Sequence, residues 1–371
     1  MNKVAIAISG GVDSGAAAAL VLKAGFKAAG FHLSLWSEGI KDKRLENKCC
    51  RTDSLEAARK TARQLGIPFY VLNLEKTFKK RVVDYFLKEY SLGRTPNPCV
   101  KCNQFIKFGE LLDYVRKRGY EFLATGHYAK VIKAIGGKSR FSLLRGKDRK
   151  KDQSYFLYNL NQKQLSQVLF PVGEYRKEQV VAMAKKWKLS VARRPESQEI
   201  CFFPESDYRL FLKRQIGRKI IPGEVVSSKG KKIGNHRGLP LYTVGQRHGF
   251  TITDKRVFGP LYIIGKDFKK NQIIVGFGKE AEIRQFWVKN INWINKSGRR
   301  AAKSEKGLRC QVRIRHQGEP LVARVKEDEK TGRTNVFLDE GERGVSPGQA
   351  AVFYRKEELI GGGIVMVDKN E

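Results

Sequence analysis

The hexapeptide at residues 9–14 (SGGVDS) lies between an apolar run and a helix-forming run, and it constrains the fold more than any other stretch. The apolar run at residues 4–8 predicts a buried strand, and residues 16–22, followed by Gly25, predict a helix. A glycine turn between a strand and a helix start presents backbone N–H groups and a partial positive charge. The segment therefore predicts an anion-binding turn in an α/β domain.

The hexapeptide lacks the lysine of a Walker A loop and the spacing of the G-x-G-x-x-G dinucleotide fingerprint. A loop with Ser9, Asp13 and Ser14 but no lysine is better suited to bind a pyrophosphate leaving group than to bind a γ-phosphate that is transferred. The Asp13 carboxylate could hold a Mg²⁺ ion that bridges phosphate oxygens. The alternative is an ordinary strand-to-helix turn of small residues, and the full hexapeptide in this context argues against it.

Strand and helix patterns alternate over the first 212 residues and predict a doubly wound parallel sheet with a nucleotide at the carboxyl ends of its strands. Further strands are expected at residues 28–35, 67–74 and 122–124, and helices at 52–64, 78–90 and 105–117. Glycine and β-branched residues dominate the rest, which predicts two small β-rich domains, the second a β-barrel. The expected domains are residues 1–212, 213–280 and 281–371.

The chain of 371 residues has 73 Lys and Arg against 37 Asp and Glu residues, so its formal net charge is +36. Such an excess predicts attraction to polyanions, and its spread over every segment favours a nucleic-acid surface. No run approaches the ~20 apolar residues of a membrane span, and no signal peptide is evident. We therefore expect a cytoplasmic protein without a membrane partner, whose six cysteines are reactive or metal-binding.

Two prolines stiffen the segment at residues 95–103 (TPNPCVKCN), which delivers Cys102 to the start of the following helix. The helix N-terminus, Lys101 and Lys107 are expected to stabilise a thiolate at this position. The spacing between Cys99 and Cys102 alone is ambiguous between redox chemistry, metal binding and chance. This loop is the second candidate site in the sequence.

The other cysteines and the histidines carry weaker signals. Cys201 precedes two phenylalanines, and composition alone favours a buried apolar cysteine there. Adjacent Cys49 and Cys50 favour a structural or accessory role, and Cys310, in an alternating run, is expected in a core. His127 follows a strand end and is a candidate site residue, whereas His32, His236 and His316 are expected to be structural.

With these motifs in hand, the chain resembles the bacterial tRNA-specific 2-thiouridylases over nearly its whole length. Beside the loop at 9–14, the matching segments are RTPNP at 94–98, ATGHY at 124–128, KDQSYFL at 151–157, ICF at 200–202, YTVGQR at 242–247 and SPGQ at 346–349. The resemblance implies a pyrophosphatase-loop domain, similar to the adenine nucleotide alpha hydrolases, followed by two β-rich domains.

The resemblance also implies the reaction. ATP adenylates O2 of the wobble uridine (position 34) in the tRNAs for Lys, Glu and Gln, so that the oxygen can leave as part of AMP. Sulfur arrives as a persulfide on Cys201, from a sulfur-relay protein or a cysteine desulfurase. Either the persulfide attacks C2 directly, or Cys102 attacks the persulfide, releases hydrosulfide and closes a disulfide with Cys201.

Site residues follow from the same resemblance. The catalytic residues are expected to be Asp13, Cys102 and Cys201. The residues expected around ATP are Ala7, Ile8, Ser9, Gly10, Gly11, Val12, Asp13, Ser14, Leu33 and Gly126. The residues expected on tRNA, whose target base must leave its stack, are Asn97, Pro98, Cys99, His127, Lys151, Asp152, Gln153, Arg313, Ile314 and Gln349. A solvated turn is an equal alternative for residues 151–154.

Three alternatives stay open at this point. Cys99 stands where some family members carry an acidic residue, and Cys99, Cys102 and Cys201 could hold an iron–sulfur cluster, a route ranked below the persulfide route. A pyrophosphatase-loop ligase that attaches an amine or amino acid to tRNA would need no reactive cysteines. A non-catalytic basic RNA-binding protein would release neither pyrophosphate nor AMP with tRNA present.

Overall fold

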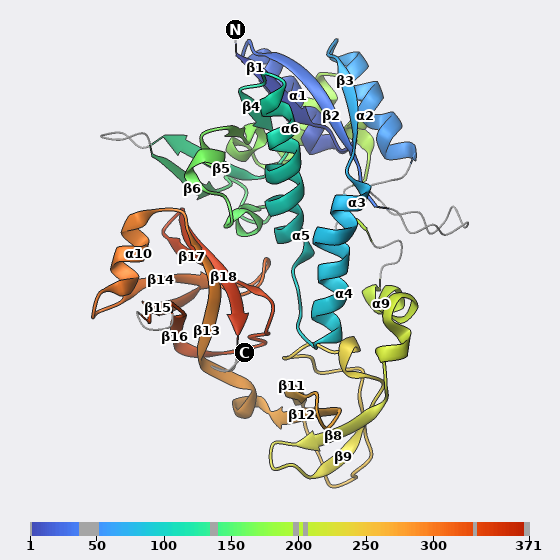
Figure 1. The fold of residues 1–371 in the computed structure, drawn as a ribbon, viewed down its shortest axis with the longest axis vertical. Coiled ribbons are helices and arrows are strands. Elements are labelled where there is room, and N and C mark those ends of the chain that lie inside the picture. Colours follow the sequence, from blue (N-terminus) through green and yellow to red (C-terminus); the bar gives the residue numbers. More distant parts are fainter. Residues whose placement is uncertain are drawn as a thin grey trace. The chain divides into compact units, whose positions relative to one another are not determined.

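The computed structural model describes residues 2–36, 52–133, 140–195, 200–202, 207–328 and 332–366. The chain divides into two compact units, each assembled from separate stretches of sequence (Figure 1). The first unit consists of residues 1–83, 98–206 and 356–360, and the second of residues 84–97, 207–355 and 361–371. Cys49 and Cys50 lie outside the described residues, so the prediction for them stays a prediction.

A five-stranded parallel sheet forms the centre of the first unit. Its order is β3 (Phe69–Asn73), β2 (Lys27–Ser34), β1 (Lys3–Ala7), β4 (Phe122–Ala124) and β7 (Val168–Leu169). The chain moves outward from β1 in one direction through β2 and β3, and in the other through β4 and β7. The carboxyl end of β1 is therefore the point where the strand order reverses, which is where doubly wound sheets bind ligands. The predicted fold class is confirmed.

Helix α1 (Val12–Lys23) follows β1 directly, and most of its residues are buried. Its middle is a run of alanines. Ala18 packs with the strand residues of the sheet, whereas Ala16 and Ala17 pack with residues of helix α8 (Lys177–Lys186) and its surroundings. Small side chains let the helix approach both layers closely. Gly25, with φ +83°, ends the helix as the sequence predicts.

The other helices of the first unit cover the sheet and carry the cysteine loop. Helix α2 spans Thr52–Gln64, and α3 (Glu75–Phe78) continues into a π-helical turn at Lys79–Val83. A longer helical stretch consists of α5 (Pro98–Lys101), a π-helical segment (Cys102–Leu111) and α6 (Leu112–Lys117). This stretch begins at Pro98, so the expectation that Cys102 stands at a helix start is wrong.

A hairpin of β5 (Ala129–Lys133) and β6 (Phe141–Arg145) completes the first unit. Strand β6 pairs with Glu358 and Leu359, the first residues of β18 (Glu358–Met366). Tyr155 and Tyr158 are among the largest fully buried side chains of this unit.

The second unit contains helix α4 (Asp84–Ser91), helix α9 (Tyr208–Ile216) and two β-structures. The smaller structure is a five-stranded sheet whose core includes Val225, Ile263 and Ile273. Its strands, in sheet order, are β10 (Thr251–Ile252), β9 (Lys232–His236), β8 (Gly223–Ser227), β12 (Gln272–Phe277) and β11 (Leu261–Asp267).

The larger structure of the second unit is a closed antiparallel barrel, as the sequence predicts. Its strands are β13 (Glu282–Trp293), β16 (Thr334–Arg343), β15 (Leu321–Glu327), β14 (Leu308–Arg313), β17 (Ala350–Arg355) and β18, and β18 pairs back to β13. Cys310 on β14 is buried, which confirms it as a core residue. Helix α10 (Lys296–Lys303) precedes β14.

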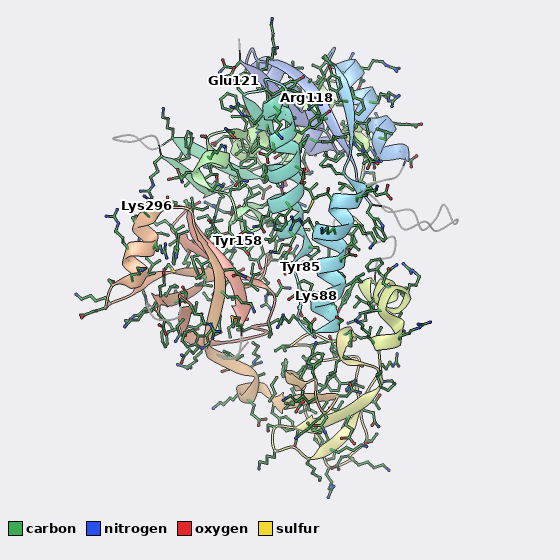
Figure 2. The ribbon with its side chains drawn as sticks, in the orientation of Figure 1. Tyr85, Lys88, Arg118, Glu121, Tyr158 and Lys296 are labelled. Carbon is green, nitrogen blue, oxygen red and sulfur yellow. The ribbon has the colours of Figure 1, made fainter. Side chains whose placement is uncertain are left out.

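Side chains that end in nitrogen project from the ribbon of both units, in keeping with the net charge of +36 (Figure 2). In the part of the chain that the structure describes, no helix is both long enough and apolar enough to cross a membrane.

The alanine run of α1 generates a prediction about stability. Ala17→Leu is expected to lower the free energy of unfolding by about 1–3 kcal/mol, because the larger side chain must enter a closely packed interface. Chemical denaturation followed by circular dichroism measures this change. Ala24→Leu, at the exposed end of the same helix, is the control and should change stability by less than about 0.5 kcal/mol. Equal effects of the two substitutions would contradict the packing argument.

Candidate active site

A cavity of about 360 Å³ opens at the carboxyl end of β1, within the first unit. Its wall combines the loop after β1 with the start of the 98–117 helical stretch and with residues 200–202. The predicted site residues that line it are Ala7, Ile8, Ser9, Asp13, Ser14, Leu33, Pro98, Cys99, Cys102, Gly126, His127, Gln153 and Cys201. The structure thus brings together the anion loop and the candidate thiols.

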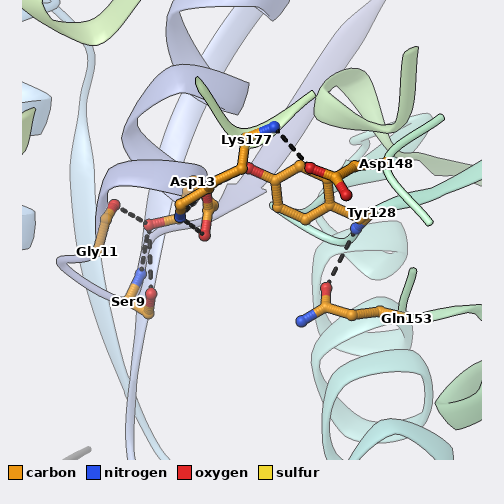
Figure 3. A network of polar contacts seen from close by, with 8 residues as sticks. Ser9, Gly11, Asp13, Tyr128, Asp148, Gln153 and Lys177 are labelled. Carbon is orange, nitrogen blue, oxygen red and sulfur yellow. Dashed lines mark hydrogen bonds and ion pairs between the residues drawn. The ribbon is translucent and has the colours of Figure 1, made fainter. Parts of the chain in front are cut away.

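Hydrogen bonds within the loop hold it in one shape (Figure 3). The Ser14 hydroxyl donates to the Gly11 carbonyl oxygen over 2.9 Å, and it accepts the Ser9 backbone N–H over 3.2 Å. The Gly15 N–H donates to the Gly11 carbonyl, which opens helix α1. The loop therefore ends in a helix N-terminus whose first N–H groups have no partner within the helix, and such a turn attracts anions.

Close backbone approaches explain two glycines of the site. Gly10 has φ +80°, and a Cβ there would lie 2.3 Å from the Ser54 carbonyl oxygen on α2. A Cβ at Gly126 would lie 2.8 Å from the backbone carbonyl carbon of Asp13. The Arg194 guanidinium further ties the loop to α2, because it donates to the carbonyl oxygens of Gly10 and Asp53 over 3.2 and 2.9 Å.

Asp13 is the centre of a polar network that the sequence does not reveal (Figure 3). The Lys177 ammonium lies 2.8 Å from both oxygens of the Asp13 carboxylate, and the Tyr128 hydroxyl donates to one of them over 2.7 Å. The Lys177 backbone N–H donates to Asp148, and the Tyr128 N–H donates to the Gln153 amide oxygen. Lys177 is 164 positions from Asp13, so no local motif could have indicated the pair.

The sequence suggests two metal groups, a Mg²⁺ ion on Asp13 and an iron–sulfur cluster on Cys99, Cys102 and Cys201. Both Asp13 oxygens accept hydrogen bonds from Lys177, so this carboxylate is paired with an ammonium group, and its role as a Mg²⁺ ligand stays a prediction. Among the described residues, no group of three or more His, Cys, Asp and Glu side chains has a geometry that could hold a metal ion. Cys99, Cys102 and Cys201 share the cavity wall without forming such a group.

Cys99 and Cys102 have raised pKa values, contrary to the expectation for Cys102. Burial raises the pKa of Cys102 to about 12, and the nearby Lys107 ammonium only partly opposes this rise. Burial also raises the pKa of Cys99 to about 12, with smaller contributions from Cys201 and Cys102. Because Cys102 lies inside a helical stretch rather than at its start, the helix N-terminus gives it little stabilisation.

His127 lies on the thiol side of the cavity as a neutral side chain. Burial lowers its pKa well below the ordinary value, and the Lys107 ammonium lowers it further. Its Nδ1 lies 2.7 Å from the Thr125 hydroxyl, and its Nε2 lies 3.5 Å from the Lys107 ammonium. Since the ammonium can only donate, Nε2 is the acceptor and Nδ1 carries the proton.

Several predicted tRNA-contact residues lie away from this cavity. Asp152 is buried and its carboxylate accepts the N–H groups of Gly146 and Ser154, so it holds its own loop. Asn97, Arg313, Ile314 and Gln349 belong to the second unit, and the Ile314 side chain is buried there. The roles of these residues and of Lys151 on tRNA stay predictions.

Other residues of the cavity escaped the sequence analysis. His32, expected as structural, lines the cavity and also lies 2.9 Å from the Ile8 carbonyl oxygen through its Nδ1. Asn103 lines it from the helical stretch, together with Lys107, which the sequence analysis had placed near Cys102, and Phe202 lines it beside Cys201. The position of Asn103 directly after Cys102 was the available signal for that residue, whereas His32 had none beyond its strand.

Three known domain families match the chain in succession. Residues 2–205 match the tRNA methyl transferase HUP domain, and residues 209–277 match the tRNA methyl transferase PRC-barrel domain. Residues 283–365 match the aminomethyltransferase beta-barrel domain. The first match alone covers more than half of the chain.

Curated relatives cover nearly the full length. The chain is 44% identical over 363 residues to the tRNA-specific 2-thiouridylase MnmA of Chloroflexus aurantiacus, with 98% of both chains covered. It is 42% identical to the protein of that name from Carboxydothermus hydrogenoformans, over 98% of this chain and 97% of the relative. The protein of that name from Symbiobacterium thermophilum is 38% identical, over 98% of this chain and 92% of the relative. The chain therefore belongs to the tRNA-specific 2-thiouridylase family.

Proposed function

We propose that this tRNA-uridine 2-sulfurtransferase activates O2 of the wobble uridine with ATP and then replaces that oxygen by sulfur carried on Cys201. One observation carries the proposal: the anion-binding loop and the thiols line one cavity of about 360 Å³. Activation and sulfur transfer can then act on one base without moving it between sites. The proposed substrates are the tRNAs for Lys, Glu and Gln, as the family resemblance implies.

The first proposed step is adenylation. Uridine O2 attacks the α-phosphorus of ATP, the bond between that phosphorus and the bridging oxygen breaks, and pyrophosphate leaves. The loop at residues 9–14 receives the pyrophosphate, because backbone N–H groups at the start of α1 complement its charge. The adenylated oxygen is then a leaving group in the form of AMP.

The second proposed step is sulfur transfer. In one version the terminal sulfur of a Cys201 persulfide attacks C2 of the uridine, and AMP leaves with the former O2. The Cys102 thiolate then attacks the Cys201 sulfur, the S–S bond to the transferred sulfur breaks, and a Cys102–Cys201 disulfide forms. In the other version the Cys102 thiolate attacks the Cys201 sulfur first, forms the same disulfide and releases hydrosulfide, which attacks C2 and displaces AMP. In both versions a thiol reductant regenerates the free cysteines.

The raised pKa of Cys102 is consistent with both versions, because in each of them Cys102 acts only after the persulfide has formed on Cys201. A neutral thiol does not attack a persulfide, so Cys102 stays inactive until a base removes its proton. The Lys107 ammonium favours the thiolate once it forms, because it lowers the pKa against the effect of burial. A sulfur-donor protein that reaches Cys201 is the proposed partner, and Asn97, Pro98 and Cys99 are the proposed neighbours of the target base.

Replacing the persulfide-carrying cysteine tests the proposal directly. Cys201→Ser is expected to abolish thiolation of tRNA, because serine cannot carry the transferred sulfur. The measurement is mass spectrometry of tRNA nucleosides after incubation with ATP, the physiological sulfur donor and the protein. Cys310→Ala, at a buried thiol of the barrel, is the control and should keep the oxygen-to-sulfur mass gain. Thiolation by the Cys201 variant would overturn the persulfide assignment.

The same assay separates the competing functions. A tRNA mass gain that corresponds to an attached amine or amino acid would indicate a ligase. Absence of both pyrophosphate and AMP with tRNA present would indicate a non-catalytic RNA-binding protein. Release of both products together with the sulfur mass gain is the expected result.

Gly10 provides a test of the anion loop. Gly10→Ala is expected to lower ATP-dependent thiolation at least tenfold, because its methyl group would collide with the Ser54 carbonyl and displace the loop. Initial rates of tRNA thiolation measure the effect. Gly25→Ala is a matched control: its φ of +83° imposes the same backbone strain, but nothing lies within 4 Å of the added Cβ. A similar rate loss in both variants would show that strain alone is responsible.

The pKa of Cys102 predicts slow alkylation. A pKa of about 12 instead of 9.0 lowers the thiolate fraction at pH 8 about 1000-fold. Iodoacetamide should therefore label Cys102 at least 100-fold more slowly in the native protein than in urea, and the native rate should rise with pH up to about 12. Peptide mass spectrometry after timed labelling measures both rates. Rapid native labelling at pH 7 would mean that the thiolate is stabilised after all.

A further inference from the structure

We propose that Lys177 binds the pyrophosphate portion of ATP and supplies the cation that the loop at residues 9–14 lacks. The inference rests on the proposed adenylation and adds a phosphate-binding residue to it. In the sequence the loop has two serines and an aspartate but no lysine or arginine. In the structure the ammonium group of Lys177, on a helix that is distant in the sequence, forms an ion pair with the acidic side chain of the loop.

The fold holds Lys177 at this position. It is the first residue of α8, its backbone N–H donates to Asp148 over 2.9 Å, and only 13% of its side chain is exposed. Helix α8 packs against α1 through Val180, which shares a cluster with Ala16 and Ala17. Lys177 and the loop therefore stand on two helices that are packed together, and the ammonium is placed before any ligand arrives.

Charge favours a phosphate-binding role. Asp13 places a carboxylate on a loop whose backbone is arranged to bind an anion, and like charges repel. Lys177 neutralises that carboxylate, since its Nζ lies 2.8 Å from both oxygens. When pyrophosphate develops its charge on leaving the α-phosphorus, an ammonium at this point can be shared between Asp13 and the phosphate oxygens.

Asp13 keeps a partner when the ammonium turns toward phosphate. The Tyr128 hydroxyl donates to Asp13 Oδ1 over 2.7 Å, so sharing Lys177 does not leave the carboxylate without a donor. The Tyr128 backbone N–H in turn donates to Gln153, which lines the cavity. Lys177 can therefore change partners without disrupting the loop.

Two other cations near the cavity are engaged differently. Arg194 donates to the carbonyl oxygens of Gly10 and Asp53, which fixes the shape of the loop. Lys107 lies 3.5 Å from His127 and lowers the pKa of Cys102, so it acts on the thiol side. Lys177 is the cation that contacts the acidic side chain of the loop itself.

The experiment measures binding of inorganic pyrophosphate, ATP and AMP by isothermal titration calorimetry. Lys177→Met is expected to weaken pyrophosphate and ATP at least tenfold and to change AMP less than twofold. Lys177→Arg, which retains a cation, should restore most of the pyrophosphate affinity. Lys130→Met is the control, because Lys130 pairs with Glu174 on the same unit at 3.9 Å and has no role in the site.

A double variant separates phosphate binding from mere neutralisation of Asp13. If Lys177 only neutralises Asp13, then Asp13→Asn combined with Lys177→Met should bind pyrophosphate as tightly as Asp13→Asn alone. If Lys177 binds phosphate, the double variant should stay at least tenfold weaker than Asp13→Asn. The double variant also removes both charges of the pair together, so it avoids the unpaired charge that could unfold Lys177→Met.

The outcomes for the inference and for the proposed function are distinct. A wild-type protein that binds neither pyrophosphate nor ATP would overturn the adenylation proposal and the inference with it. If the wild-type protein binds both ligands, either of two results would overturn the inference alone. One is equal affinity in the wild type and in Lys177→Met, and the other is equal affinity in Asp13→Asn and in the double variant. A selective loss of pyrophosphate and ATP affinity in both backgrounds supports it.

Discussion

The close packing of one loop backbone against its neighbours is the constraint on which the site depends. Gly10 lies where a Cβ would strike the Ser54 carbonyl, and Gly126 lies where a Cβ would strike the backbone of Asp13. These approaches clamp the loop between α2 and the strand end after β4, at the point where the strand order of the sheet reverses. The N-terminus of α1 is thereby aimed into the cavity, and the chemistry proposed here needs that fixed direction.

The two sides of this one cavity have opposite electrostatic requirements. In the proposed reaction the loop side attracts the most charged part of ATP, whereas burial on the thiol side raises the pKa values of Cys99 and Cys102. Lys177 contacts the loop through Asp13, and Lys107 lies on the thiol side, so each side of the cavity has a nearby cation. A neutral His127 adds no charge on the thiol side. In the proposed reaction this separation would let pyrophosphate leave on one side before sulfur transfer takes place on the other.

Much of this arrangement could be predicted from the sequence, for identifiable reasons. The strand, glycine turn and helix after residue 3 follow from local apolar patterning and turn chemistry, and the barrel follows from its alternating strands. The Lys177–Asp13 pair could not be predicted, because 164 positions separate two ordinary residues that only packing of α8 against α1 brings together. The expected thiolate at Cys102 was wrong for a similar reason. The helix starts one turn earlier than its sequence pattern suggests, and burial raises the pKa of Cys102 more than the nearby lysine lowers it.

The interleaved composition of the two units has a consequence for synthesis on the ribosome. Residues 356–360 belong to the first unit, although the chain has by then passed through nearly all of the second. Strand β6 finds its partners Glu358 and Leu359 only after these residues have left the exit tunnel. The nucleotide-binding half therefore cannot reach its final form until residues 356–360 have been synthesised, after most of the second unit. A truncated product loses an edge of the first unit as well as the end of the barrel.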